Sequence, residues 1–331
     1  MSLQTILDFF AAFHRTAAIK TGVDLDVFTA VAEGVETAGA LAVRCQAAER
    51  GIRILCDYLT SVGLLTKAGE RYALGADAAT FLDRRSPIYF GSMATSVAGE
   101  ANLQGFARLT AAVRQGATAL PAGGMLAPEH PAWVDFARAT TPAGTFMGPL
   151  LATLLNVSAG GRMKVLDIAA GHGLFGIAVA TQNLQAEVVA LDWPNVLAVA
   201  REHADAAGVA RRYRTIPGSV FTEELGDGYD LVLLTNFLPD LDPGSCEQVL
   251  ARVHAALVPG GRAVALQFVP DDDRVSPPAA ADLSLALLAT TPGGDTYTFA
   301  ELDQMFRHAG FPGTELHELP PLRVVMAYRS R

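Results

Sequence analysis

Two apolar segments in the middle of the chain each end in an aspartate, and the first runs directly into a glycine-rich turn. The first segment is 165–173 (VLDIAAGHG), which contains Asp167, and the second is 188–192 (VVALD), which ends in Asp192. Short, continuous apolar runs are typical of strands that are buried on both faces of a parallel sheet. Such sheets bind ligands at the carboxyl ends of their strands. The pattern therefore predicts an α/β domain with a ligand site where these two strands end.

The acids and glycines favour a nucleotide-like cofactor. Glycines let the backbone approach a ligand closely, and Asp192 is placed to accept hydrogen bonds from a ribose diol. Residues 171–176 (GHGLFG) match the G-x-G-x-x-G spacing of dinucleotide sites, but Asp167 would face the pyrophosphate and repel it. The same acid suits a ligand with an ammonium group, such as the methionine end of S-adenosylmethionine. A strand–helix–strand unit without a ligand, in which Asp167 only caps the turn, is the remaining alternative.

Residues 160–331 alternate strand patterns with helix patterns. Seven strands are predicted, at 164–168, 187–191, 212–216, 229–235, 262–268, 312–318 and 323–329. The last two lie close together around residues 319–321 (LPP), which indicates an antiparallel hairpin at the end of a mostly parallel, Rossmann-like sheet. Thr298 and Glu301 have the spacing of a helix capping box.

The N-terminal part is predicted to be a separate all-α, winged-helix domain. Residues 2–33 carry apolar side chains at helical spacing, helices are expected at 37–45 and 48–62, and a hairpin turns at Gly69 and Glu70. We expect domain boundaries at 1–100, 101–155 for a helical linker that lines a substrate pocket, and 156–331 for the cofactor domain. A winged helix can bind DNA, but Arg50 and Arg53 are balanced by Glu49, so a ligand-responsive DNA-binding regulator is the weaker alternative.

Charge and cysteine content narrow the class of protein. The formal net charge is −9, and such an acidic chain is a poor ligand for nucleic acid or an anionic membrane. Three cysteines without C-x-x-C spacing (Cys45, Cys56 and Cys246) are typical of reduced thiols in a cytoplasmic protein. No apolar run reaches the about 18 residues of a membrane span. We expect a cytoplasmic protein that binds neither nucleic acid nor membrane.

Five motifs together resemble the class I S-adenosylmethionine-dependent methyltransferases, and within them the small-molecule O-methyltransferases with an N-terminal dimerisation domain. They are 167–173 (DIAAGHG), 191–193 (LDW), 229–238 (YDLVLLTNFL), 257–262 (LVPGGR) and 298–311 (TFAELDQMFRHAGF). The resemblance covers almost the whole chain. It implies S-adenosyl-L-methionine as the cofactor, methyl transfer to a small-molecule acceptor in secondary metabolism, and a homodimer formed through the N-terminal domain.

The resemblance also assigns a set of cofactor-binding residues. They are Asp167, Ala169, Gly171, His172, Gly173, Asp192, Trp193, Gly218, Ser219, Val220, Thr235 and Asn236. Asp167 would bind the methionyl ammonium directly or through water, and Asp192 the ribose, with Trp193 beside the adenine. Ala169 stands where the family usually has glycine, and Ser219 where it commonly has an acid for the adenine amino group. His172 would contact the methionyl carboxylate or lie in solvent.

The catalytic position of the family is altered in this chain. In the resembled O-methyltransferases a histidine after the fourth strand removes the acceptor's proton, and here that position is Pro239, which cannot accept one. Asp240 next to it is a candidate base. Alternatively, proximity and orientation alone drive transfer to an already reactive oxygen, carbon or nitrogen, or methyl transfer has been lost or changed. We favour proximity, with an aromatic or polyketide-like acceptor.

Four residues are candidates for the substrate pocket, namely Phe146, Met147, Phe237 and Tyr297. Aromatic and methionine side chains on helices more commonly pack in a core, which is the competing interpretation. The resembled family closes its pocket with the loop 290–297 (TTPGGDTY), which contains Tyr297. This family subtype does not generally need a metal, and we expect none here.

Overall fold

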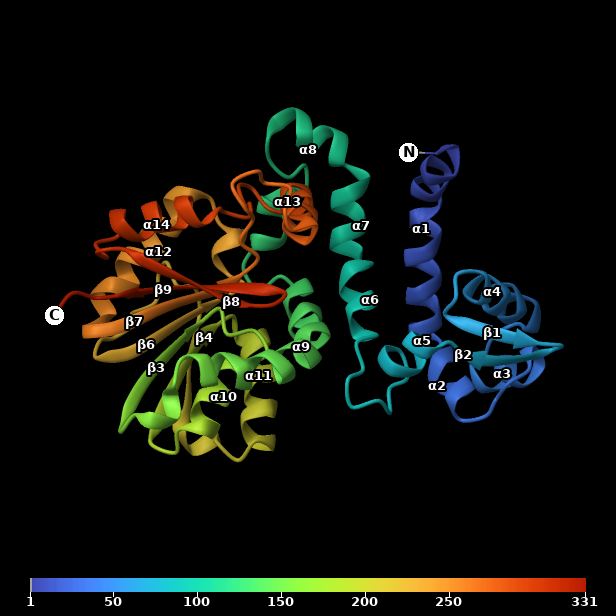
Figure 1. Ribbon diagram of the computed structural model, residues 1–331, viewed down its shortest axis with the longest axis horizontal. Helices are drawn as coiled ribbons and strands as arrows, with labels where there is room; N and C mark the ends of the chain where they lie inside the picture. The colour runs from blue at the N-terminus through green and yellow to red at the C-terminus, as the bar shows by residue number, and fades with distance from the viewer. Residues whose placement is uncertain (1) are drawn as a thin grey trace. The chain divides into compact units, whose positions relative to one another are not determined.

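The computed structural model describes residues 2–331, which divide into two compact units, one ending at Gly99 and one running from Glu100 to Arg331 (Figure 1). Residues 101–155, which the sequence analysis sets apart as a linker, belong to the same unit as the sheet. Among residues 2–331, no helix is both long and apolar enough to cross a membrane.

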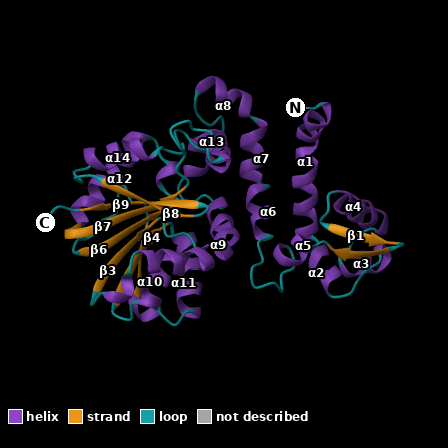
Figure 2. Cartoon of the chain, in the orientation of Figure 1, coloured by secondary structure: helices purple, strands orange, loops and turns teal. Residues whose placement is uncertain are grey.

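The N-terminal unit is helical, with one two-stranded hairpin. Its elements are α1 (Leu3–Asp24), α2 (Val27–Ala32), α3 (Ala38–Arg44), α4 (Glu49–Ser61), β1 (Leu65–Ala68), β2 (Arg71–Leu74), α5 (Ala76–Phe81) and α6 (Ser92–Val97). The helices α3 and α4 and the hairpin follow one another in the predicted order, as the purple and orange segments of Figure 2 show. Phe28, Leu41, Ile52, Leu59 and Tyr72 join these elements in one core.

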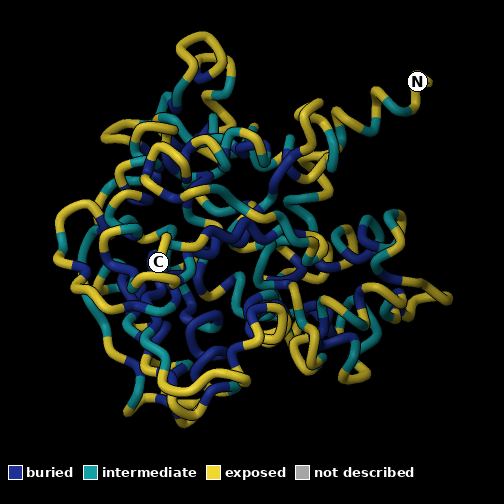
Figure 3. Tube along the Cα trace, turned by 60° about the vertical axis from the view of Figure 1, so that its left-hand side comes forward, coloured by how far each residue is buried: buried dark blue, intermediate teal, exposed yellow. Residues whose placement is uncertain are grey.

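Helix α1 carries large apolar side chains outside this core. The exposed ones are Leu3, Ile6, Leu7, Phe9, Phe10 and Phe13, and we call them the α1 apolar arc. Their spacing places all six on one side of the helix, because residues three and four apart are neighbours on a helix surface. The trace next to the N label in Figure 3 is accordingly yellow and teal. The six side chains are 41% to 76% exposed, so this side of the helix is largely uncovered.

The second unit is built on a seven-stranded sheet in the order β5-β4-β3-β6-β7-β9-β8. The strands are β3 (Met163–Ile168), β4 (Ala186–Asp192), β5 (Tyr213–Pro217), β6 (Tyr229–Thr235), β7 (Leu257–Gln267), β8 (Thr314–Leu319) and β9 (Leu322–Tyr328). The first five are parallel, and β9 runs antiparallel to both β7 and β8. The predicted fold, a mostly parallel sheet that ends in an antiparallel hairpin, is therefore confirmed.

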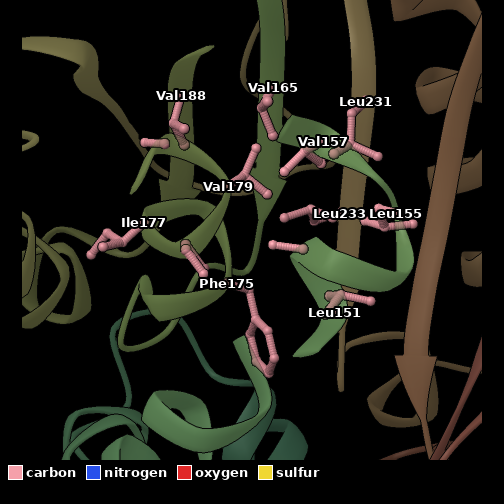
Figure 4. Packing of buried hydrophobic residues seen from close by; sticks show 14 of the residues in the cluster. Leu151, Leu155, Val157, Val165, Phe175, Ile177, Val179, Val188, Leu231 and Leu233 are labelled. Carbon is pink, nitrogen blue, oxygen red and sulfur yellow. The ribbon is translucent and has the colours of Figure 1, made fainter. Parts of the chain in front are cut away.

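Helices cover both faces of the sheet, which is why the central strands are apolar throughout (Figures 1 and 2). One face packs against α9 (Ala132–Leu154), α10 (Leu174–Gln182) and α11 (Pro194–Ala206), and the other against α12 (Pro243–Ala256) and α14 (Phe299–His308). Figure 4 shows the first of these cores, where Leu151 of α9 and Leu155 just after it meet Val179 of α10 and Val165 and Leu231 of the sheet. The predicted capping box of α14 is present, since Thr298 and Glu301 bind each other's backbone N–H groups.

Three further helical segments lie near the C-terminal end of α13 (Pro278–Thr290). They are α7 (Glu100–Ala107), α8 (Leu109–Gln115) and the 3-10 segment η1 (Pro121–Leu126). Thr118 accounts for much of the contact, because its backbone N–H donates to Thr291 O at 3.0 Å and its hydroxyl donates to Ala289 O at 2.7 Å. Residues 100–126 are thereby fastened to the loop 291–297 that follows α13.

Candidate active site

The turn after β3 is shaped by left-handed backbone at alternate residues. Gly171 and Gly173 have φ values of 56° and 74°, and Ala169 has a φ of 52°. Glycine adopts this region freely, whereas alanine does so at a cost of about 1 kcal/mol. Ala169, where the family usually has glycine, thus adopts the left-handed conformation that a glycine would have, at the cost of local strain.

Asp167 lies beneath this turn and is fully buried. Its Oδ2 atom accepts a hydrogen bond from Gly176 N at 3.1 Å, while Oδ1 has no hydrogen-bond partner among the described residues. Burial raises the pKa of this carboxyl well above its usual range, and the nearby Asp192 adds to the effect. A buried carboxylate oxygen without a donor is costly, so the site fits a ligand that brings a positive donor group.

Asp192 at the end of β4 joins the second strand to the glycine turn. Its Oδ2 accepts from Gly171 N at 2.8 Å and its Oδ1 accepts from Trp193 N at 2.7 Å. Burial raises the pKa of Asp192 to about 6, although both backbone N–H groups lower it. Each carboxylate oxygen can accept a second hydrogen bond, so the group can still bind a diol. Trp193 begins the first turn of α11 as its N-cap.

His172 is buried and does not lie in solvent, which corrects one of the two sequence-based alternatives for this residue. Its Nδ1 atom accepts a hydrogen bond from Leu174 N at 3.1 Å. Burial, together with nearby His203, lowers the pKa of His172 to about 3, so the ring is neutral and its proton lies on Nε2. Gly144 of α9 makes room for the ring, because a Cβ there would lie 2.4 Å from His172 Cε1 and Nε2.

The ends of β5 and β6 complete the same edge of the sheet. Gly218 N donates to Asp192 O at 2.9 Å, and Val220 is buried. The Ser219 hydroxyl oxygen accepts from Phe221 N at 3.2 Å, which ties it to its own turn. Leu234 of β6 pairs with Ile168 of β3, so the following Thr235 and Asn236 lie beside the glycine turn. The predicted cofactor residues thus gather at the carboxyl ends of four neighbouring strands.

The four predicted pocket residues have different surroundings. Phe146 is 65% exposed on α9, whereas Met147 is 5% exposed and packs in the core on the first face of the sheet. Tyr297 is buried, and its hydroxyl donates to Leu241 O. Phe237 is partly buried against the core on the second face. Met147 and Tyr297 therefore have structural contacts that account for their burial.

Two polar residues that the sequence analysis did not single out are buried without partners in the described chain. Gln267 ends β7 and neither of its amide atoms has a hydrogen bond. The Tyr213 hydroxyl has none either, and it lies 2.5 Å from where a Cβ on Gly173 would be. A glutamine in an otherwise apolar strand (AVALQ) is the one sequence signal that could have found Gln267.

Among residues 2–331, no group of three or more acidic, histidine or cysteine side chains is placed to hold a metal ion. The acids of the site bind backbone N–H groups instead. The free acceptor capacity of Asp167 and Asp192 fits an organic ligand with an ammonium group and ribose hydroxyls.

Comparison with known proteins identifies the family. Residues 151–312 match a model of the O-methyltransferase domain, and residues 7–84 match the O-methyltransferase dimerisation domain. The 3-hydroxy-5-methyl-1-naphthoate 3-O-methyltransferase of Streptomyces sahachiroi is 32% identical over 302 residues, covering 89% of this chain and 84% of that protein. The tetracenomycin polyketide synthesis 8-O-methyl transferase TcmO of Streptomyces glaucescens is 31% identical over 312 residues, covering 92% of this chain and 90% of that protein.

A solved structure agrees with these matches. A crystal structure of a Nostoc punctiforme protein described as an O-methyltransferase superposes with a TM-score of 0.94 at 48% sequence identity, covering 99% of each chain. The fold, the site at the carboxyl edge of the sheet and the sequence matches agree. The chain belongs to the S-adenosylmethionine-dependent O-methyltransferase family.

Proposed function

We propose that this methyltransferase acts on a hydroxyl group of an aromatic or polyketide-like small molecule. The observation that carries the cofactor half of the proposal is that Asp167, which has an unpartnered buried oxygen, and Asp192 lie at the ends of two neighbouring strands. The relatives named above act on a hydroxynaphthoate and in tetracenomycin polyketide synthesis, which supports an acceptor of this chemical class.

The residues around the glycine turn divide the binding of S-adenosylmethionine between them. Asp167 meets the ammonium group, Asp192 meets the ribose hydroxyls, and Trp193 lies beside the adenine. The other contacts come from Ala169, Gly171, His172, Gly173, Gly218, Ser219, Val220, Thr235 and Asn236. When bound, the cofactor supplies an electrophilic methyl group. Thr235 at the end of β6 and Asn236 after it face the acceptor, together with Phe237 and Phe146.

Proximity and orientation supply a large part of the rate. Pro239 stands where the family's histidine would be and cannot take a proton, so a fixed in-line arrangement of donor and acceptor must lower the barrier. Closing such a site also excludes water from the reacting atoms. Thr118 holds the segment 100–126 against the end of α13 and the loop after it, which supports a substrate pocket enclosed by these segments.

The N-terminal unit is a winged-helix module that joins two copies of the chain in a cytoplasmic homodimer. The match of residues 7–84 to a dimerisation domain supports this role, and so does the α1 apolar arc. An exposed apolar helix face of this kind is typical of a protein contact. The net charge of −9 argues against a second role in binding nucleic acid.

Calorimetry followed by an acceptor screen tests the proposal. S-adenosylmethionine and S-adenosylhomocysteine should bind with micromolar affinity, and Asp192→Ala should remove binding because both the ribose contact and the anchor of Gly171 are lost. Glu187→Ala is the matched control, since that acid lies exposed near the start of the same strand. Transfer of a deuterated methyl group to hydroxynaphthoates, followed by mass spectrometry, identifies the acceptor class. A folded protein that binds neither ligand contradicts the proposal.

A further inference from the structure

The turn after β6 carries a carboxylate that the rest of the protein does not use. Asp240 lies on the 3-10 turn η4 (Leu238–Asp240), five residues after Thr235 ends β6. Its side chain is partly buried, and within residues 2–331 its oxygens have neither a hydrogen bond nor an ion pair. Because β6 lies directly beside β3, this turn is at the same edge of the sheet as the cofactor-binding turn.

The backbone around Asp240 is held firmly from two sides. Three carbonyl groups of the turn accept hydrogen bonds from α12 and from the loop 291–297, namely Leu238 O from Cys246 Sγ at 3.3 Å, Pro239 O from Asp295 N at 2.9 Å, and Leu241 O from the Tyr297 hydroxyl. Gly294 fits closely against the turn, since a Cβ there would lie 2.5 Å from Pro239 O. The turn is therefore rigid, while its one carboxylate at position 240 is left available.

The neighbouring Asp242 shows what an ordinary acid does in this place. Its carboxylate caps α12, accepting from Ser245 N at 3.0 Å and from the Ser245 hydroxyl at 2.6 Å, and these bonds lower its pKa. Burial without a compensating bond instead raises the pKa of Asp240 to about 7. A proton acceptor works best when its pKa is near the operating pH.

The other titratable groups packed against the turn leave Asp240 free to exchange its proton. On α12, burial raises the pKa of Cys246 to about 12, so the thiol is neutral. In the loop, Asp295 is paired with Ser284 at 2.6 Å and with Arg274 at 3.4 Å, and the Tyr297 hydroxyl is engaged with the backbone. None of these groups neutralises or protonates the Asp240 carboxylate.

We infer that Asp240 is the general base of this enzyme and takes the proton that Pro239 cannot take. This rests on the proposed function, methyl transfer to a hydroxyl group. The acceptor's O–H bond breaks and its proton passes to the Asp240 carboxylate. The acceptor oxygen forms the new bond to the methyl carbon, and the pair of electrons that held the methyl group stays on sulfur. Asp240 then returns its proton to solvent.

Two variants separate this role from a structural one. Asp240→Asn removes the base, and Asp242→Asn alters an acid of the same turn that is already engaged. Binding of S-adenosylmethionine is measured first by calorimetry, and both variants should bind it like the wild-type protein. The rate is then followed against pH with 2-naphthol and with a more acidic cyano-substituted 2-naphthol as acceptors.

We expect Asp240→Asn to lower kcat/KM for 2-naphthol by roughly 10²–10⁴-fold and to abolish the inflection near pH 7. The loss should be smaller for the more acidic naphthol, which needs less help to ionise. Asp242→Asn should keep the inflection and most of the rate. Selective ¹³C labelling of aspartate carboxyls, followed by NMR in the cofactor-free protein, should show a carboxyl titrating near pH 7 that Asp240→Asn removes and that Asp167→Asn and Asp192→Asn do not, although burial raises the pKa of those two acids as well.

Several outcomes overturn the inference. One is an Asp240→Asn variant that keeps both rate and inflection, and another is an Asp240 carboxyl that titrates at its ordinary value near pH 4. A wild-type protein that binds the cofactor but methylates no naphthol contradicts both the acceptor class and this role. Failure of the wild-type protein to bind the cofactor contradicts the proposed function itself, and the NMR titration does not depend on that result.

Discussion

At the scale of single residues, hydrogen-bond partners decide the chemistry of the acids in this enzyme. Asp240 and Asp242 are two residues apart, yet burial raises the pKa of the first to about 7 and bonds to Ser245 lower that of the second. The same contrast separates the two oxygens of Asp167, of which one is bonded and the other is not. Residue type alone therefore says little about which acid reacts.

The raised pKa of Asp240 predicts a cost in stability. Between about pH 4, the pKa of an unfolded aspartate, and about pH 7, the folded protein holds a proton that the unfolded chain has lost, so stability falls as pH rises through this range. The asparagine of Asp240→Asn does not titrate, so the variant does not have this pH-dependent loss of stability. It should be more stable than the wild-type protein by about 1–3 kcal/mol at pH 8, and the difference should vanish below pH 4. Urea denaturation at the two pH values measures both quantities.

Asp242→Asn is the control with the opposite sign. The lowered pKa of Asp242 stabilises the folded state above about pH 4, and this contribution is lost as the pH falls through the folded pKa. Its replacement should therefore be neutral or slightly destabilising at pH 8. If Asp240→Asn were also destabilising at pH 8, the carboxylate would have a favourable partner, and its assignment as a free group would be wrong.

At the scale of helices and strands, the sequence predicts the sheet well because its signals are local. Apolar runs that end in Asp167 and Asp192 need only their neighbours in sequence to be recognised as buried strands, and all seven strands are found within a few residues of their predicted limits, apart from an earlier start for β7 at Leu257. The site residues that depend on distant partners are different. Neither Tyr213 beneath Gly173 nor Gly144 against His172 follows from any local pattern, because each contact joins elements that are far apart in sequence.

The contact between α9 and the glycine turn predicts a link from helix packing to cofactor binding. Gly144→Ala would normally stabilise a helix by up to about 1 kcal/mol, but here the new methyl group would lie 2.4 Å from the His172 ring. The variant should lose about 1–3 kcal/mol of stability, and the displaced turn should bind S-adenosylmethionine at least roughly tenfold more weakly. Thermal unfolding and calorimetry measure the two effects separately.

Gly148→Ala is the matched substitution on the same helix. A Cβ at Gly148 would lie 2.9 Å from Leu174 O and 3.2 Å from the Ala178 methyl group, both on α10, and Leu174 follows the turn and donates its N–H to His172. It should cost similar stability but weaken cofactor binding less than Gly144→Ala, because the new methyl group does not meet the His172 ring. Equal losses of affinity in the two variants would show that α9 acts through general packing and not through His172.

At the scale of the whole molecule, the two units of the chain differ in how they cover their apolar side chains. The enzyme unit has a closed core, and the N-terminal unit leaves one apolar helix face uncovered. The sheet unit buries its large side chains between two layers of helices. The α1 apolar arc has no such cover within its own unit. Burying a phenylalanine side chain stabilises a contact by about 1.5–3 kcal/mol, so the arc can contribute substantially to an interface.

The dimer proposal predicts that charges on the α1 apolar arc separate the two copies. In a symmetric dimer each substitution acts twice, so Phe10→Glu combined with Phe13→Glu should weaken association by at least about 3–5 kcal/mol, a factor of roughly 10²–10³ or more. Analytical ultracentrifugation should then find monomers at concentrations where the wild-type protein is a dimer. Leu184→Glu is the control, because Leu184 is equally exposed, at 77%, but lies in the sheet unit before β4. A double variant that stays dimeric would show that the interface does not depend on the α1 apolar arc. A Leu184 variant that dissociates would instead place the interface on the unit that carries the active site.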